Sequence, residues 1–258
     1  MAIQKDGTGR CSLLPNRLTD KTRGRPLAEL LAVTFLAWVA SLLLLALGRA
    51  WPWLTPYRPL LATAPLIYLP LALTLYRQEP FARYGLCAGH VGRALGLTVL
   101  AMVIVFPFFA LGFHMVRHGG GPVNAAGVGI APFAWLNWLL QTPQAWPWLL
   151  QSFMWELCFV ALPEEFFYRG YLQGALNRHF TSRRLILGTA VGIALPASAI
   201  LFALHHFVIS PIPQVLLVFF PALLFGWLRE ATGSLLAPGL FHAACNVFAV
   251  LLTKASSF

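Results

Sequence analysis

A few ionisable and amide side chains interrupt segments of the chain that are otherwise apolar. The stretch "PEEFFYRGY" at 163–171 holds two adjacent carboxylates and an arginine, "LFALHHF" at 201–207 holds two histidines, and "HAACN" at 242–246 joins a histidine to an asparagine. An ionisable group inside a membrane segment is costly, and it is therefore a functional-site hypothesis by default. These three stretches are the first candidates for chemistry.

The first stretch separates into a pair and a single carboxylate. Glu165 and Arg169 are four residues apart, so on a helix they share a face and can form a salt bridge that locks two helices. Glu164 is rotated by about 100° from Glu165 and can point into a cavity instead. Pro163 has no N–H, so the carbonyl one turn earlier must find its partner on a neighbouring helix or in a cavity.

The other two stretches also present polar groups at helical spacing. Phe202 and His206 share one helix face, whereas His205 is turned away by about 100°. His242 and Asn246 point the same way from one helix, and hydrogen bonds between helices would be an explanation without chemistry. Together with Glu164, these groups form a possible constellation of glutamate, histidine and asparagine on three helices.

Such a constellation suits hydrolysis. A carboxylate can take a proton from water while a histidine holds that water, and a second histidine and an amide can donate hydrogen bonds to an oxyanion. Ser198 and Cys158 are not placed as obvious nucleophiles, so activated water is favoured. Zinc is the alternative, with Glu164, His206 and His242 as ligands, although the His-Glu-x-x-His signature is absent. Spacing alone leaves open whether there is no cofactor or one divalent metal ion.

The composition indicates which elements must position these groups. The chain has 258 residues, 59% of them hydrophobic and 10% charged, whereas soluble domains carry about 25% charged residues. An integral membrane protein with the lipid bilayer as partner is therefore expected. The net charge is +10, but basic and aromatic residues do not interleave as in nucleic-acid binders, so no nucleic-acid partner is expected. The four cysteines match no zinc or redox spacing and are expected to be free thiols.

Seven segments are long and apolar enough for membrane spans. They lie at roughly 27–48, 58–76, 93–116, 146–168, 185–208, 211–228 and 234–253. The segment 131–141 is too short to span unaided and is expected to lie in the interface or re-enter the membrane. The expected fold is an all-α, polytopic membrane helix bundle of about seven transmembrane helices, or eight if 131–141 also spans. A basic tail at 1–26 precedes a single helical domain at 27–258.

The distribution of positive charge predicts the orientation. With the N-terminus in the cytoplasm, most of the 18 lysines and arginines fall on the inner side, as the positive-inside rule requires. Tryptophans such as Trp51, Trp53, Trp146 and Trp148 then lie near the outer headgroups, which indoles favour. The charge pattern and the short chain favour a bacterial inner membrane with a cytoplasmic N-terminus.

The three stretches in this order resemble the signature of the CPBP family, which comprises the type II CAAX prenyl endopeptidases and the Abi-like bacterial proteins. Its pattern is Glu-Glu-x-x-x-Arg, Phe-x-x-x-His and His-x-x-x-Asn. The residues that match it are Glu164, Glu165, Arg169, Phe202, His206, His242 and Asn246. The resemblance covers about 146–250, and it selects His206 over His205.

The resemblance implies an intramembrane endopeptidase, a metalloprotease by common label, although a metal-independent glutamate mechanism is also argued for this family. It assigns water activation to Glu164 and His206 and the oxyanion to His242 and Asn246, while Glu165 and Arg169 orient the site. Implied substrates are membrane-associated peptides or proteins, including prenylated and sorting-type C-terminal tails; the latter would point to the myxosortase branch. A metal-free mechanism is favoured, because the side chains resemble an acid–base pair facing an oxyanion site.

Two other functions remain open. A non-catalytic membrane adaptor or bacteriocin self-immunity protein could share the scaffold, but unused buried charges are costly. A proton-relaying transporter would be expected to show inverted repeats, which the sequence lacks. The protease hypothesis also sets a geometric condition. The helix that begins near 146 must continue past Arg169, and Glu164 and His206 must lie within about 10 Å of each other, since proton transfer needs short contacts.

Overall fold

The protein is a bundle of helices, which we describe from a computed structural model. The described residues are 4–5, 11–12, 27–87, 89–118 and 134–255, so most of the expected basic tail lies outside them. The longer helices are α1 (Leu27–Ala50), α2 (Arg58–Tyr76), α3 (Val91–His118), α5 (Ala145–Glu156), α8 (Ala194–Ile209), α9 (Phe219–Thr232) and α10 (Leu236–Ala255). Shorter helical segments are η1 (Pro52–Tyr57), η2 (Phe81–Tyr84), α4 (Ala134–Gln141), η3 (Leu157–Ala161), α6 (Leu162–Glu165), η4 (Phe166–Gln173), α7 (Gly174–His179) and η5 (Pro213–Val218). The strands β1 (Gln4–Lys5) and β2 (Cys11–Ser12) pair antiparallel, as do β3 (Arg183–Ile186) and β4 (Thr189–Gly192).

Five helical segments of the described chain are long and apolar enough to cross a membrane. They are Leu27–Ala50, Pro52–Tyr76, Val91–Met115, Pro213–Thr232 and Leu236–Ala255. Large apolar side chains face outward from these helices; Phe35 is 69% and Phe108 72% exposed, which suits contact with lipid and not with water. The protein is thus an integral membrane protein, and the expected all-α membrane bundle is confirmed, although the expected number of seven spans is not established.

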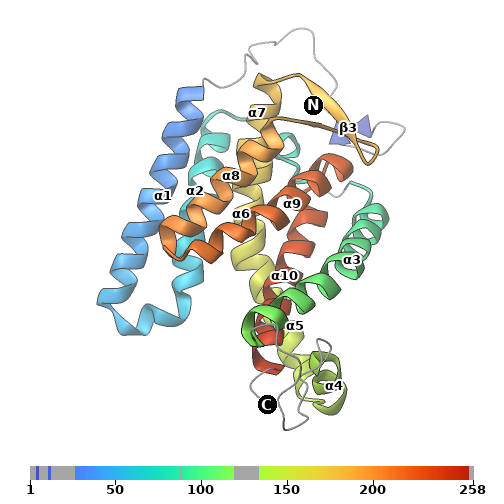
Figure 1. Ribbon diagram of the computed structural model, residues 1–258. Coiled ribbons are helices and arrows are strands. Elements are labelled where there is room, and N and C mark those ends of the chain that lie inside the picture. The colour runs from blue at the N-terminus through green and yellow to red at the C-terminus, as the bar shows by residue number, and fades with distance from the viewer. Residues whose placement is uncertain (1–3, 6–10, 13–26, 88, 119–133, 256–258) are drawn as a thin grey trace.

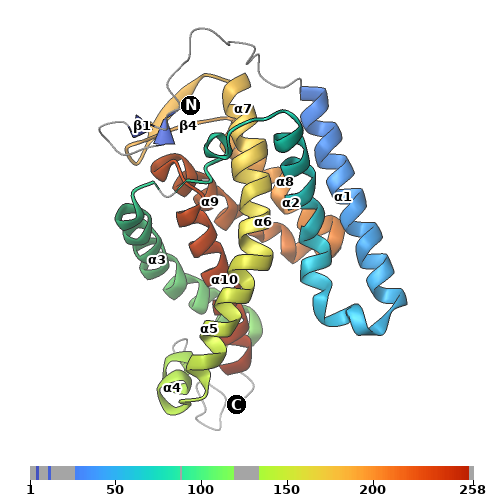
Figure 2. The ribbon, with the colours of Figure 1, turned by 180° about the vertical axis from the view of Figure 1, so that it is seen from behind.

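One continuous helical path forms the centre of the bundle. From Ala145 to His179 the chain passes through α5, η3, α6, η4 and α7, and the junction residues keep right-handed helical dihedral angles. Helices α2, α8, α9 and α10 pack against this path, and Figures 1 and 2 show α1 and α2 on one side of it and α3 on the other. The helix that carries Glu164 therefore does continue past Arg169.

Two π-helical segments, η3 and η4, flank the carboxylate pair on this path. Wide helical turns of this kind occur often at functional sites, because they shift side chains out of regular register. Pro163 lies between them and has no N–H to donate to the carbonyl of Phe159. The hydroxyl of Thr63 on α2 donates to that carbonyl at 2.7 Å, so a neighbouring helix satisfies the freed group as expected.

The expected fifth span at 185–208 is wrong in its first part. Residues 183–192 form the hairpin β3–β4, and α8 begins only at Ala194. Leu187 and Gly188 have φ angles of 49° and 73°, which close a tight two-residue turn. The remaining helix of 16 residues is about 24 Å long, shorter than the hydrocarbon core of about 30 Å.

The short segment expected at 131–141 contains helix α4. Helix α4 has eight residues and is about 12 Å long, too short to span alone, and residues 131–133 lie outside the described chain. The expectation of four free thiols is wrong, because Cys87 is disulfide-bonded. Cys158 and Cys245 are free thiols.

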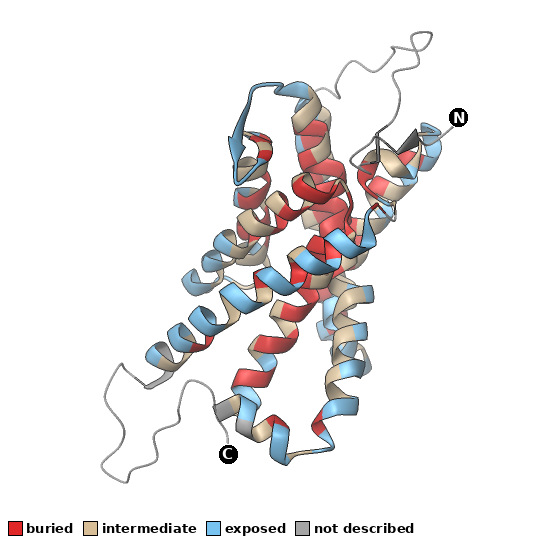
Figure 3. Cartoon of the chain, turned by 90° about the vertical axis from the view of Figure 1, so that its right-hand side faces the viewer, coloured by how far each residue is buried: buried red, intermediate tan, exposed pale blue. Residues whose placement is uncertain are grey.

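Burial is concentrated where the central helical path meets α8, α9 and α10. Figure 3 shows the buried residues in the middle of the molecule, while the ends and outer faces of the helices are exposed. Close packing at this place depends on small residues. A side chain at Gly239 of α10 would come within 2.9 Å of the Leu162 side chain, so glycine allows α10 to approach the helix that bears Glu164.

Candidate active site

Two histidines, from α8 and α10, converge on one buried carboxylate oxygen of the central helical path. Glu164 Oε2 lies 3.9 Å from His206 Nε2 and 3.7 Å from His242 Nε2. The condition that Glu164 and His206 lie within about 10 Å is therefore met. Glu164 Oε2 has no hydrogen-bond partner among the described residues. These separations are too long for direct hydrogen bonds, but one water molecule can reach the oxygen and a ring nitrogen together.

The orientation of His206 is fixed by its own helix. Its Nδ1 lies 3.0 Å from the carbonyl oxygen of Phe202, which can only accept, so Nδ1 carries the proton and donates. In the neutral ring Nε2 then has a free lone pair, and this atom faces Glu164. The side chain of His206 is 30% exposed, whereas that of Glu164 is 8% exposed, so the site is reached from the side of His206.

His242 is oriented by the second carboxylate. Its Nδ1 donates to Glu165 Oε1 at 2.9 Å, which directs Nε2 towards Glu164. The ring of Phe225 stacks on the imidazole, with centroids 4.7 Å apart and an angle of 16° between the planes. A carboxylate behind a histidine selects its tautomer and holds the ring in place, so Glu165 acts through His242.

Arg169 occupies a fully buried position beside the same carboxylate. Its Nη1 donates to Glu165 Oε1 at 3.1 Å and its Nη2 to the carbonyl of Ala222 at 3.1 Å. The guanidinium carbon lies 4.4 Å from the ring centroid of Phe202 and 5.2 Å from that of Phe225. Arg169 thus pairs with Glu165 as expected and also fixes α9 and two aromatic rings next to the histidines.

Asn246 lies one turn beyond His242 on α10 and has a partner that the motifs did not indicate. Its Nδ2 donates to Glu156 Oε2 at 2.8 Å. An amide nitrogen carries two hydrogens, so one N–H remains for another acceptor. Glu156 therefore holds the Asn246 amide in one orientation.

The remaining polar candidates lie away from Glu164. His205 stacks on Trp38, with ring centroids 5.6 Å apart, so the two adjacent histidines face different surroundings. Ser198 donates its hydroxyl to the carbonyl of Tyr168 at 2.8 Å. Cys158 is exposed on the side of the helix. Neither Ser198 nor Cys158 therefore faces the converging groups as a nucleophile would.

The geometry does not fit a metal ion as it stands. Two ligands of a tetrahedral zinc ion are about 3.3 Å apart when each lies about 2.0 Å from the metal. The corresponding separations from Glu164 Oε2 are 3.7 and 3.9 Å, and within the described ranges no group of three His, Cys, Asp or Glu side chains could hold a metal ion. We therefore derive no step through a metal from Glu164, His206 and His242.

The buried cluster of Glu164, His206 and His242 has the side-chain types that hydrolysis by activated water requires. Comparison with family models agrees: the model described as "Type II CAAX prenyl endopeptidase Rce1-like" matches residues 146–248. This part of the chain is thus similar to that family, consistent with the CPBP resemblance of the motifs, and the match supports a CAAX-type intramembrane protease in general. No curated protein and no solved structure is significantly similar to the chain. The match does not distinguish the myxosortase branch, which stays an expectation.

Some of the residues around the site were not predicted to take part. Glu156 was visible as a polar residue in a span but had no expected role, although it lies eight residues before Glu164, roughly two turns. Phe225 carried no signal at all, because one phenylalanine among 20 in an apolar chain is unremarkable in sequence. Both are recognised only through the side chains that they hold, Asn246 and His242.

Proposed function

We propose that the protein is an endopeptidase that hydrolyses a peptide bond of a membrane-associated peptide or protein by means of activated water. The observation that carries this proposal is the convergence of Glu164 Oε2, buried and without a hydrogen-bond partner in the described chain, with the Nε2 atoms of His206 and His242. A carboxylate without a partner beside a histidine lone pair is suited to bind and deprotonate water.

In the proposed reaction, water lies between Glu164 and His206 Nε2. Glu164 takes one proton as the water oxygen attacks the scissile carbonyl, and a tetrahedral oxyanion forms. The second N–H of Asn246 and a protonated Nε2 of His242 donate to that oxyanion. A proton on Nε2 would also add a positive charge to a cluster that holds two carboxylates, Glu164 and Glu165, and the single guanidinium of Arg169. Glu164 then gives its proton to the leaving nitrogen, and the C–N bond breaks.

Burial of the site supports peptide chemistry inside the bundle. Electrostatic interactions are stronger where water is excluded, so preorganised donors contribute more to the stability of the transition state. The proposal keeps the cytoplasmic N-terminus and the bacterial inner membrane expected from the basic residues. Labelling of an introduced cysteine near the N-terminus with a membrane-impermeant reagent would test this orientation.

The proposal is tested with the purified full-length protein in liposomes and a library of apolar peptides, with products read by mass spectrometry. We expect cleavage, and we expect an excess of chelator to change the rate by less than about twofold, because water rather than a metal-bound hydroxide is the nucleophile. Folded protein that cleaves no peptide would favour the non-catalytic adaptor. Loss of cleavage in chelator with recovery on adding zinc would contradict the metal-free mechanism.

A further inference from the structure

A β-hairpin at one end of the bundle exposes large apolar side chains. Leu185 and Leu187 of the hairpin β3–β4 are 78% and 85% exposed, which is more than any other large aliphatic side chain of the described residues. Figure 1 shows the hairpin at the end of the bundle where α1 begins. The hairpin is not a span, so the lipid around the spans does not account for its apolar tip, which needs a partner that shields it from water.

The tight turn of this hairpin gives no reason of its own for a leucine. Leu187 and Gly188 have φ angles of 49° and 73°. Glycine, asparagine and aspartate adopt such angles most easily, whereas a leucine is disfavoured there. What favours leucine at position 187 therefore lies outside the turn.

Trp227 places the tip of the hairpin at the level of the lipid headgroups. Its Nε1 donates to the carbonyl of Ile186 at 3.0 Å. Trp227 lies five residues before the end of the apolar segment Pro213–Thr232, which is about 7.5 Å along the helix. Indole rings favour the headgroup level of a membrane. The neighbouring Leu185 and Leu187 therefore lie at a depth where apolar side chains can enter the bilayer.

Two adjacent arginines of β3 have different surroundings. Arg183 Nη1 donates to Glu230 Oε2 at 3.0 Å, and Glu230 Oε1 accepts hydrogen bonds from Gln173 and Asn177. These bonds fasten the hairpin to α9 and to the central helical path. Arg184 is exposed and has no ion-pair partner within the described part of the chain. Its guanidinium is therefore available to an anion outside the protein.

Arginines also gather around the hairpin. They outnumber the glutamates in the helix ends and connections on this side of the bundle, as far as the structure describes them. The arginines are Arg77, Arg83, Arg93, Arg178, Arg183, Arg184 and Arg229, and the glutamates are Glu29, Glu79 and Glu230. Such an excess of positive charge beside a membrane is complementary to anionic phospholipids.

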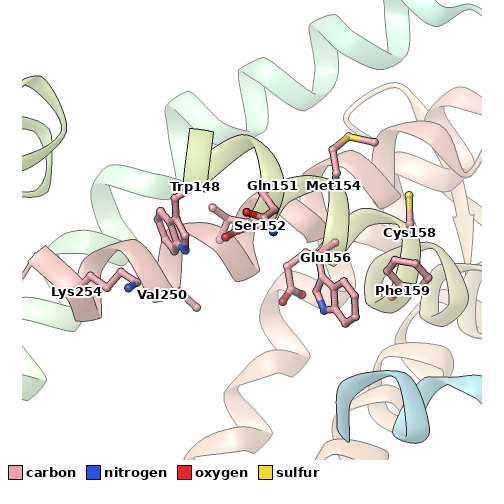
Figure 4. Close-up of a pocket in the computed structure, with 11 residues that line it drawn as sticks. Trp148, Gln151, Ser152, Met154, Glu156, Cys158, Phe159, Val250 and Lys254 are labelled. Carbon is pink, nitrogen blue, oxygen red and sulfur yellow. The ribbon is translucent and has the colours of Figure 1, made fainter. Parts of the chain in front are cut away.

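The hairpin is separate from the groove beside the candidate active site. That groove, of about 660 Å³, lies between α10 and the path α5–η3, and Figure 4 shows Trp148 and Glu156 among the side chains that line it. Glu156 accepts the Asn246 amide, so the groove belongs to the site already described. It extends to Lys254 near the end of α10, whereas β4 packs on α9, which ends just before α10 begins.

We propose that the β3–β4 hairpin inserts Leu185 and Leu187 into the headgroup layer of the membrane and that Arg184 binds the phosphate group of an anionic phospholipid there. The proposal does not depend on peptide cleavage. Through Trp227 the inserted hairpin holds the end of α9 at one depth, and α9 also carries Phe225, which stacks on His242.

The test places a fluorescent amino acid at position 185 by codon reassignment, in the full-length protein in liposomes. The quenchers are phosphatidylglycerol or phosphatidylcholine with acyl chains brominated near the headgroup, at equal mole fraction. We expect both lipids to quench, and phosphatidylglycerol to be favoured beside the probe about fivefold, the ratio that one arginine near an anionic surface provides. In about 1 M salt this preference should fall below about twofold, because salt screens exposed charges.

The controls separate the headgroup site from general contact with lipid. Arg184→Gln should abolish the preference for phosphatidylglycerol, and Arg184→Lys should keep most of it. The same probe at position 43 should be quenched equally by both lipids, since Leu43 is 61% exposed on α1 with no charged residue within one turn. Arg184 is exposed, so the melting temperature of Arg184→Gln should stay close to that of the wild-type protein.

Three results would overturn the proposal. Equal quenching at position 185 by the two lipids, or an unchanged preference in Arg184→Gln, would exclude the anionic headgroup site. Quenching by iodide from the aqueous phase, without quenching by either lipid, would place the hairpin in water. A probe shielded from iodide and from both lipids would assign the tip to a protein contact, such as a second copy of the chain.

Discussion

Replacing Glu164 by glutamine is expected to slow peptide cleavage by about 10³-fold, because the variant keeps the shape of the side chain but cannot accept the proton of the attacking water. The carboxylate is buried, and its Oε2 faces two histidine nitrogens, so glutamine fits the same space. The measurement is the initial rate of cleavage in liposomes. The melting temperature in detergent should stay close to that of the wild-type protein, because the variant keeps the side-chain volume and removes a buried negative charge.

The matched control for this variant is Glu29→Gln. Glu29 on α1 pairs at 2.9 Å with Arg77, which directly follows α2, and it is not among the residues that contact the histidines, so its loss should leave the cleavage rate within about twofold. A Glu164→Gln variant with the same rate as the Glu29→Gln variant would show that Glu164 is not the base.

Replacing Arg169 by methionine is expected to cost about 3–5 kcal/mol of stability, which corresponds to a drop of about 10 °C in melting temperature. The change removes the partner of a fully buried carboxylate, because Arg169 donates to Glu165 Oε1 and both side chains are 0% exposed. It also removes the bond to the Ala222 carbonyl and the cation above the Phe202 ring. Unfolding is followed in detergent by the melting temperature of the purified protein.

A double variant distinguishes lost charge compensation from lost packing. In Glu165→Gln combined with Arg169→Met, neither member of the buried pair keeps a charge without its partner, so we expect part of the lost melting temperature to return. A double variant that is as unstable as the sum of the two single variants would contradict a compensated pair. Arg169→Lys should recover little, since lysine cannot make both hydrogen bonds of the planar guanidinium.

The site could be predicted from sequence where spacing along a single helix decides the geometry. Glu165 and Arg169 pair, as their separation of four residues indicated, and Glu164 is left for other contacts. The convergence of His206 and His242 on Glu164 was expected only on the condition that the helix continue past Arg169, because contacts between helices depend on packing and not on spacing. The catalytic roles of these residues stay predictions.

The fold was less predictable in segments where only the apolar composition, and not the spacing of residues along a helix, indicated the structure. Residues 185–192 are apolar enough for a span, yet they turn back as a hairpin, since short apolar runs cannot be assigned to helix or strand from periodicity. The bond between Asn246 and Glu156 joins residues 90 positions apart, and no local pattern indicates it. The π-helical segments lie on either side of Pro163, and the hydroxyl that bonds the Phe159 carbonyl comes from Thr63 on another helix, so no local pattern predicted them.

The most direct test of water held jointly by Glu164 and His206 is a double-mutant cycle on the cleavage rate. Groups that act as one unit give non-additive losses. We expect His206→Gln alone to slow cleavage about 10²-fold and Glu164→Gln alone to slow it about 10³-fold. The double variant should be slower than Glu164→Gln by no more than about threefold. His205→Gln is the matched control, because that ring stacks on Trp38 instead of facing Glu164. A double variant slowed by the product of the two single losses would contradict a shared water.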